Sequence, residues 1–166
     1  MPRAIYPVLM RPISAVARVA IAVLITFTAA LPGLFFSPAR DGWFGSLAEP
    51  FFAPPPGVFA PVWTVLYTMM GIAAGLVWAQ HKLVAVKPAL SLYAAQLFLN
   101  ALWTVVFFGM HAPAAALVVI LCLLVFIGLT MRAFVAVDRT SARLLLPYLV
   151  WVAFATLLNA GYVFLN

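Results

Sequence analysis

The chain has 166 residues, of which 67% are hydrophobic and only 7% are charged, and its formal net charge is +6. A soluble domain is closer to half apolar and a quarter charged, and no fold of this length could bury so much apolar surface. The composition therefore predicts an integral membrane protein. The single cysteine, Cys122, excludes an internal disulfide, and one cysteine does not make a metal site.

The N-terminal segment, residues 1–18, carries three arginines and is followed by an apolar run over 19–36. This run is long for the core of a cleaved signal peptide, and Pro32 interrupts it near its end. We therefore expect a basic N-terminal extension over 1–18 and an uncleaved first span.

Five segments are long and apolar enough to cross a bilayer as helices: 13–36, 58–80, 88–110, 113–137 and 143–165. They lack the alternation of β-barrel strands, so we expect an all-α integral membrane protein, a five-transmembrane-helix bundle. The connections are short except for residues 37–56, which are rich in aromatic side chains and prolines. A loop of this length in a compact bundle is usually functional.

The basic residues are distributed unequally between the two sides of this five-span arrangement. Eight of the nine fall on one side and only Arg40 falls on the other. Because they are few and scattered between apolar runs, membrane topology explains them better than a nucleic-acid partner. The positive-inside rule predicts a multi-pass protein with a cytoplasmic N-terminus, and it places loop 37–56 on the outer side.

Polar and aromatic residues recur at helical spacing in three of the spans and form one stripe on each helix. The stripes are Tyr93, Gln96, Asn100, Trp103 and Phe107 in the third span, Trp151, Ala155, Asn159 and Tyr162 in the fifth, and Trp63 and Tyr67 in the second. One interpretation is that they only hold helices together and form interfacial belts. The other is a mostly apolar pocket with a few polar groups, as lipid-soluble ligands require. Spacing alone leaves both open.

Small residues add a packing signal, and several kinds of site are missing. Gly71 and Gly75 form a G-x-x-x-G motif, which favours close helix packing within the chain or in a dimer.

The spans contain no Asp, Glu or His and no midpoint charge for a proton relay or an ion site. We find no catalytic triad, metal cluster or phosphate loop, so hydrolases, pumps and ion channels are disfavoured. We expect no metal and no required cofactor.

Three segments resemble the signature segments of the TspO/MBR family, which includes tryptophan-rich sensory proteins, translocator proteins and peripheral-type benzodiazepine receptors. They are FFAPPPGVFAPVWTVLYTMMG, YAAQLFLNALWTVVFFGM and PYLVWVAFATLLNAGYVFLN. The resemblance covers residues 19–166 and implies a five-helix bundle that is commonly a homodimer in membrane lipid. It also implies a pocket, open toward the first loop, that binds porphyrins such as protoporphyrin IX or haem, or other hydrophobic small molecules, in tetrapyrrole and stress regulation.

The stripes and the resemblance together give a set of ligand-binding residues from the first loop and three spans. The set is Trp43, Phe44, Trp63, Tyr67, Gln96, Asn100, Trp103, Trp151, Ala155 and Asn159. No catalytic residue is expected of a binding protein, whereas Trp63 and Trp151 would be the photochemical groups of a porphyrin-degrading enzyme. No basic residue follows Tyr162, so the family's cholesterol motif is incomplete here.

The prolines at 54–56 predict a semi-rigid ramp from the loop into the second span. We expect this ramp to hold Trp43, Phe51 and Phe52 over the mouth of the bundle, so that residues 37–56 form a lid on the pocket. A plain boundary between loop and helix is the alternative. The leading function is a membrane receptor or transporter-like porphyrin binder. The alternatives are a light-dependent porphyrin-degrading enzyme and a structural or regulatory subunit with a vestigial pocket.

Overall fold

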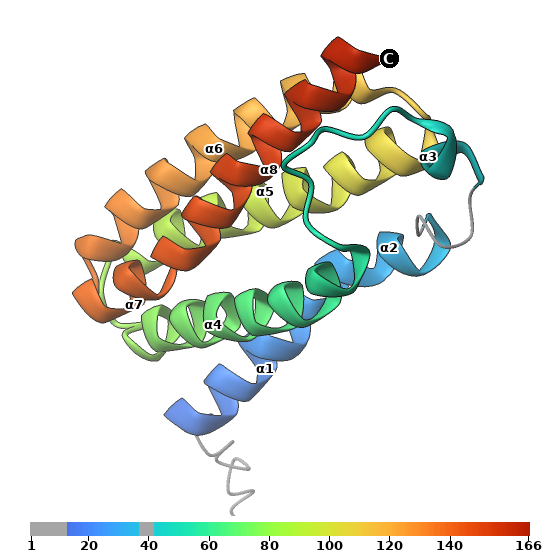
Figure 1. Ribbon diagram of the computed structural model, residues 1–166. Helices are drawn as coiled ribbons and strands as arrows, with labels where there is room; N and C mark the ends of the chain where they lie inside the picture. Colours follow the sequence, from blue (N-terminus) through green and yellow to red (C-terminus); the bar gives the residue numbers. More distant parts are fainter. Residues whose placement is uncertain (1–12, 37–41) are drawn as a thin grey trace, which may run out of the picture.

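The computed structural model describes residues 13–36 and 42–166 and is shown in Figure 1. Within these residues five helical segments are long and apolar enough to span a membrane: Ala15–Phe35, Pro56–Ala79, Val86–Gly109, Pro113–Val135 and Arg139–Leu165. The predicted all-α five-helix membrane bundle is confirmed, and each predicted span corresponds to one of these segments. Most of the basic extension lies outside the described residues, as does Arg40.

Prolines open new helical pieces inside the first and last spans instead of ending these spans. The first span consists of α1 (Ala15–Phe27), the 3₁₀ turn η1 (Thr28–Ala30) and α2 (Leu31–Phe35), and Pro32 lies in the first turn of α2. The last span consists of α7 (Arg139–Leu144) and α8 (Leu146–Leu165), and Pro147 opens α8. A proline in a first helical turn loses no hydrogen bond, because its missing N–H would have had no partner there.

The three middle spans are more continuous. The second span begins with the 3₁₀ turn η3 (Pro56–Val58) and continues as α4 (Phe59–Ala79). The third span is α5 (Val86–Thr104), which widens into the π-helical turn η4 (Val105–Gly109), and the fourth is α6 (Pro113–Val135). The sequence pattern predicted neither the π turn nor the short helix α3 (Gly42–Ser46), which lies inside the long loop.

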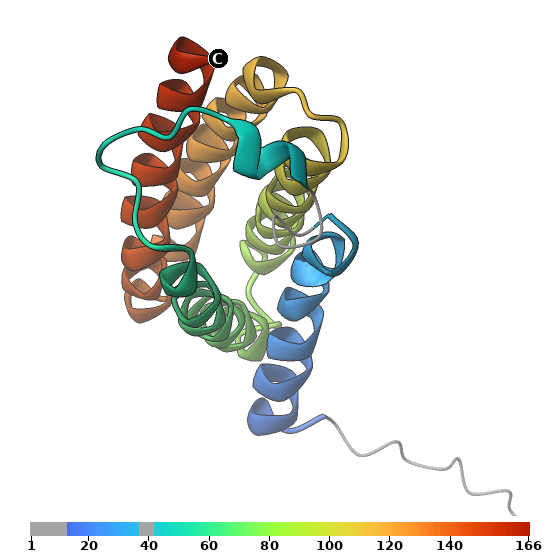
Figure 2. The same cartoon turned by 45° about the vertical axis from the view of Figure 1, so that its right-hand side comes forward.

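The helices form a ring in which α1, α4, α8, α6 and α5 follow one another, as Figure 2 shows from one end of the bundle. The G-x-x-x-G motif lies where α4 meets α1 of the same chain. A Cβ atom added to Gly71 would lie 2.5 Å from the Cα of Val23, and one added to Gly75 would lie 2.4 Å from the Cα of Val19. The motif therefore serves packing within the chain, and the homodimer stays a prediction.

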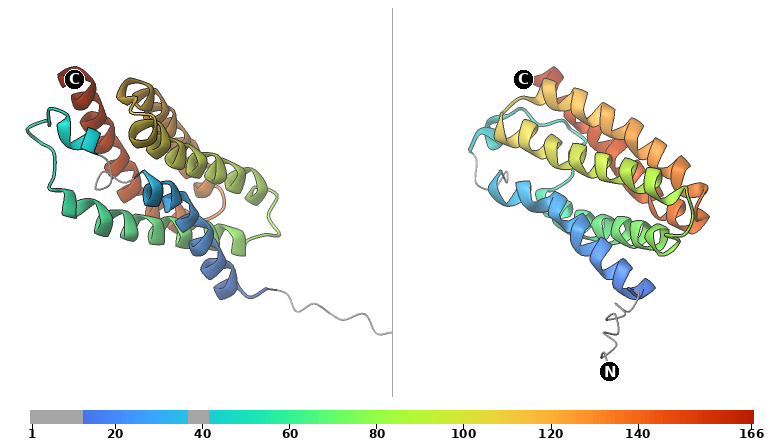
Figure 3. Two further views of the ribbon diagram at one scale, coloured as in Figure 1. Left: turned by 90° about the vertical axis from the view of Figure 1, so that its right-hand side faces the viewer. Right: turned by 180° about the vertical axis from the view of Figure 1, so that it is seen from behind.

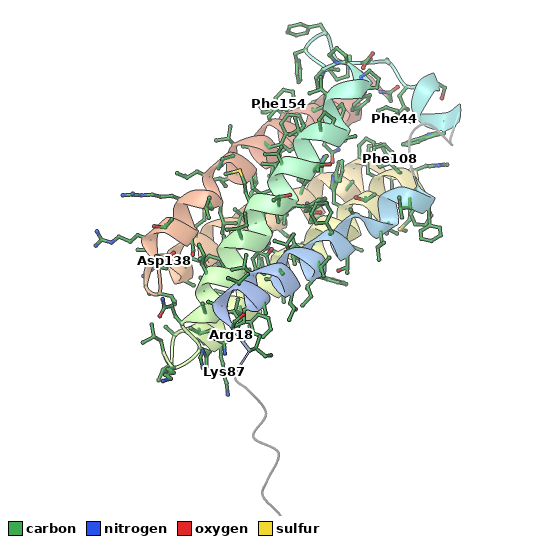
Figure 4. The ribbon with its side chains drawn as sticks, turned by 90° about the horizontal axis from the view of Figure 1, so that it is seen from below. Arg18, Phe44, Lys87, Phe108, Asp138 and Phe154 are labelled. Atoms are coloured by element: carbon green, nitrogen blue, oxygen red, sulfur yellow. The ribbon has the colours of Figure 1, made fainter. Side chains whose placement is uncertain are left out.

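The two ends of the bundle differ in chemistry: Figure 4 shows labelled side chains at each end, and Figure 3 shows which connections lie there. Arg18, Lys87 and Asp138 lie toward one end, and Phe44 and Phe108 lie at the other. The charged end contains the connection from α4 to α5 and the connection from α6 to α7, whereas the aromatic end contains α3 and the end of α8. This polarity agrees with the predicted sides of the loops, while the orientation across the membrane stays a prediction.

The connection from α6 to α7 is closed by a side-chain cap. One carboxylate oxygen of Asp138 accepts the backbone N–H of Ser141 at 2.7 Å and its hydroxyl at 2.5 Å. The hydroxyl of Ser141 contributes most to holding the pKa of Asp138 below its ordinary value. An N-cap of this kind satisfies a backbone donor at the start of α7 that has no partner within the helix.

Two apolar clusters fill the bundle. The larger cluster joins α1, α4, α5, α6 and α8, and the smaller one lies at the aromatic end around Phe107 and Tyr162. The two buried threonine hydroxyls are satisfied locally: Thr26 and Thr130 each donate to the carbonyl four residues earlier, at 2.7 Å in both cases. Thr26 also shares a 2.6 Å hydrogen bond with the hydroxyl of Tyr93, which ties α1 to α5.

Candidate ligand-binding site

A buried polar link connects three helices near the middle of the bundle. The hydroxyl of Tyr67 on α4 donates to the Oδ1 atom of Asn100 on α5 at 2.7 Å. The Nδ2 atom of Asn100 donates to the hydroxyl of Tyr148 on α8 at 3.3 Å. All three residues are buried. The oxygen and the nitrogen of the Asn100 amide thus both bond to residues of other helices. Asn100 therefore links helices, a role that its spacing in the sequence could not distinguish from ligand binding.

Aromatic rings surround this link on the α4 and α8 side. Trp63 stacks on Tyr67 with ring centroids 5.2 Å apart and meets the edge of Tyr148 at 6.3 Å. Trp151 lies edge to face with Phe59 at 5.9 Å. We call Trp63, Tyr67, Tyr148 and Trp151 the inner aromatic cluster. Phe59 contacts it through Trp151 and also packs against the smaller apolar cluster. Such rings offer broad apolar and stacking contact to a flat ligand.

A second polar link lies closer to the aromatic end. The indole Nε1 of Trp103 on α5 donates to the Oδ1 atom of Asn159 on α8 at 3.0 Å. The Nδ2 atom of Asn159 donates to the carbonyl of Pro113, at the start of α6, at 2.9 Å. This link closes three helices together, so its polar atoms too are occupied by the protein itself.

Two other buried groups have unmet hydrogen-bonding capacity. Gln96 is only 1% exposed, and neither its Nε2 nor its Oε1 atom has a hydrogen-bond partner among the described residues. The indole Nε1 of Trp151 is likewise buried without a partner there. An unpaired buried polar group costs about 1–3 kcal/mol. Because nearly all such groups in folded proteins are paired, each of these two side chains marks a position where a bound molecule could supply the missing partner.

The described part of the long loop packs over the aromatic end of the bundle. Trp43 of α3 stacks on His111 with centroids 4.3 Å apart. Phe44 contacts three rings, those of Phe107, Phe108 and Tyr162, at 5.3–6.2 Å. Trp43 and Phe44 therefore pack against the smaller apolar cluster at the aromatic end.

Further along, the loop is fastened to α8. Asn166 accepts the N–H of Ala48 at 2.8 Å through Oδ1 and donates to its carbonyl at 3.2 Å through Nδ2. Pro50 lies against Gly161 so closely that a Cβ there would meet its ring at 2.7 Å. Phe52 contacts Phe154 at 6.4 Å. The loop thus follows the C-terminal half of α8 before it turns into η3 (Figure 2).

One expectation for the loop is wrong. Phe51 does not cover the bundle mouth, because its side chain is fully exposed and, among the aromatic rings of the described residues, contacts only Phe52. The ramp itself forms as predicted, since Pro55 is extended and Pro56 starts η3. An exposed ring next to membrane spans is compatible with a lipid contact, whereas it contributes nothing to a closed pocket.

The structure thus divides the predicted site residues into two groups. Trp63, Tyr67, Asn100 and Trp151 come together in the inner part of the bundle, and Ala155 packs against the same core. Trp43, Phe44, Trp103 and Asn159 lie at the aromatic end. Sequence reasoning missed Tyr148 and Phe59. The spacing of Tyr148, three residues before Trp151, extends the stripe of the fifth span and could have revealed it.

Known proteins resemble this chain over most of its length. A sequence profile described as the TspO/MBR family matches residues 19–165, which is most of the chain. The chain belongs to the TspO/MBR family. It is 42% identical over 139 residues to the "Tryptophan-rich protein TspO" of Chlorobaculum tepidum, covering 81% of this chain and 86% of that protein.

Relatives from other organisms support the same assignment. The chain is 41% identical over 150 residues to the "Tryptophan-rich sensory protein" of Cereibacter sphaeroides, covering 87% of this chain and 92% of the relative. It is 42% identical over 120 residues to the human "Translocator protein", covering 70% of each chain. Membership in the TspO/MBR family and the five apolar helices together establish a multi-pass membrane protein.

Proposed function

We propose that this TspO/MBR protein binds porphyrins and related hydrophobic small molecules within the membrane bundle, as a receptor or transporter-like protein. The observation that carries the proposal is the unmet hydrogen-bonding capacity of two buried side chains, Gln96 and Trp151, of which Trp151 belongs to the inner aromatic cluster. A bundle stabilised only by packing would gain stability from apolar residues at these positions.

The chemistry of the surroundings fits a flat, apolar ligand that carries a few polar atoms. Trp63 and Trp151 provide large ring faces on two helices, while the amide of Gln96 offers one donor and one acceptor together. The buried part of the ligand should be uncharged, because no charged side chain of the described residues is buried to balance an ion. The macrocycle of a porphyrin meets this condition, whereas its carboxylates would have to stay outside the interior. The names of two relatives, a sensory and a translocator protein, describe roles that such binding could serve.

Titration with protoporphyrin IX tests the proposal. The protein is purified in detergent and kept in the dark. Added porphyrin should quench its tryptophan fluorescence, and the quenching should saturate. Replacing Gln96 by Leu should weaken binding at least tenfold, equivalent to about 1.4 kcal/mol. Gln80→Leu is the matched control, since Gln80 lies exposed at the end of α4 and should leave affinity unchanged.

Three outcomes would count against the proposal or change it. The absence of saturable binding to the wild-type protein would refute porphyrin binding. Equal affinities of the wild type and Gln96→Leu would remove Gln96 from the ligand contacts. A parallel irradiated sample shows whether porphyrin absorbance is lost only with protein present, and such a loss would favour the porphyrin-degrading enzyme over a receptor.

A further inference from the structure

An apolar groove opens between α4 and α8 on the side of the bundle. Its volume is about 930 Å³, and its nine lining side chains are all apolar or aromatic. Val65 of α4 and Val150 of α8 lie at its rim and are 57% and 67% exposed. Both helices belong to membrane-spanning segments, so this groove faces the lipid chains of the bilayer.

The floor of the groove is also the wall of the inner aromatic cluster. Leu66 and Trp151 line the groove. Leu66 is itself a buried member of the larger apolar cluster, and Trp151 packs against that cluster. The groove and the interior are therefore separated by the thickness of a side chain at these two positions. A change of rotamer at Leu66 or Trp151 is a much smaller motion than the separation of two helices.

The described part of the loop is fastened where an entrance from water would otherwise be expected. Ala48 is held by two hydrogen bonds to Asn166, and Pro50 is packed on Gly161. Phe44 contacts one ring of α8 and two rings of η4. Releasing the loop would break all of these contacts together, whereas no backbone hydrogen bond needs to break at the groove.

We infer that hydrophobic ligands enter and leave the bundle laterally, from the bilayer, through the groove between α4 and α8. The inference rests on the proposed binding function and adds the route. A porphyrin-like ligand partitions into lipid because burial of its apolar surface is favourable there. It would meet the groove from its lipid side, next to Trp151. The loop then acts as a fixed cover of the aromatic end.

A route affects rates without affecting the equilibrium. Narrowing the groove must slow entry and exit by the same factor, because both pass the same barrier, and must leave the dissociation constant unchanged. A change within the pocket alters the dissociation constant itself, mainly through release. The two kinds of effect are therefore separable in one set of measurements.

The test narrows the groove with Val65→Phe and Val150→Phe together. Both residues are exposed at the rim, so added rings should not disturb the core. The control is Val118→Phe with Val125→Phe, two residues of α6 that are 62% and 61% exposed and lie outside the groove. Phenylalanine adds no indole, so the tryptophan signal remains comparable among the variants.

Release is measured by mixing porphyrin-loaded protein in nanodiscs with excess empty vesicles and following the recovery of tryptophan emission. Affinity is measured by titration of the same preparations. We expect release from the groove variant to be at least fivefold slower, with a dissociation constant within twofold of wild type. The α6 control should match the wild type in both quantities.

Other results would overturn the lateral route. Unchanged release from the groove variant would do so, especially if Asn166→Ala, which removes the contact with Ala48, accelerated release instead. A large change in the dissociation constant of the groove variant would show that the groove is a binding site and not a route. Failure of the wild-type protein to bind porphyrin would refute the proposed function, and it would be evident before any rate is measured.

Discussion

The buried link Tyr67–Asn100–Tyr148 and the unpartnered Gln96 predict stability effects of opposite sign for the same substitution. Asn100→Leu removes hydrogen bonds of 2.7 and 3.3 Å and leaves two tyrosine hydroxyls buried without a partner. Hydrogen bonds between membrane helices contribute roughly 0.6 kcal/mol each on average and up to about 1.7 kcal/mol. Asn100→Leu should therefore lower the free energy of unfolding by about 1–3 kcal/mol.

Gln96→Leu lies one turn away on the same helix face and breaks no hydrogen bond among the described residues. It replaces a buried, unpaired amide by an apolar side chain of similar length. We expect Gln96→Leu to leave the free energy of unfolding unchanged or raise it by up to about 3 kcal/mol. The two substitutions are chemically matched, so their difference isolates the effect of hydrogen-bond pairing.

Equilibrium unfolding in mixed micelles, with increasing sodium dodecyl sulfate and detection by tryptophan fluorescence, measures both variants against wild type without added ligand. If Asn100→Leu were as stable as wild type, the link would not hold the helices together. If Gln96→Leu were strongly destabilised, the amide would have partners in the folded protein, such as ordered water. The second result would remove the main support for a ligand contact at Gln96.

Three more outcomes follow from other parts of the structure. Gly75→Ala should greatly reduce the yield of folded protein, because the new Cβ would lie 2.4 Å from a backbone atom of α1, whereas Gly128→Ala, with open space around it, should not. Replacing Asp138 by Ala should cost about 1 kcal/mol through the lost cap on α7. The hydrogen bond from Ser141 lowers the pKa of Asp138 in the folded protein, so Asp138 contributes its full stabilisation above its unfolded pKa near 4. This contribution is lost as the pH falls through the lower, folded-state pKa. Unfolding free energies measured between pH 5 and 2 would show the loss. Ala155→Leu should weaken porphyrin binding at least tenfold with little loss of thermal stability, and unfolding of this variant would instead mean that Ala155 is core packing.

The spans were predictable from sequence because length and hydropathy alone determine them. A bilayer requires about 20 apolar residues per helix, and five runs of that length leave few alternatives. The breaks inside the spans were less accessible. Pro32 suggested an interruption, but whether a helix ends or restarts at a proline depends on packing. The π turn at Val105–Gly109 depends on tertiary contacts that have no local signature.

The site residues were predictable as a set but not in their individual roles. Helical spacing placed Gln96 and Asn100 on the same face of α5, and both are buried. Only the arrangement of the helices shows that Asn100 bonds to two tyrosines while Gln96 has no hydrogen-bond partner in the part of the chain that the structure describes. Whether a buried amide is satisfied is a property of neighbouring helices, so it cannot be read from one helix alone.

The π turn has a consequence for reading alignments of this chain with relatives. A wide turn accommodates one more residue than an α-helical turn between the same two ends. Deleting one residue from Val105–Gly109 should therefore restore an ordinary helical turn while leaving the helix on either side of it in place. Phe107 and Phe108, both of which Phe44 contacts, lie within this turn, so the deletion would change the surface that Phe44 packs against. A one-residue gap at this place in a relative should accompany a first loop without an aromatic residue at the position of Phe44.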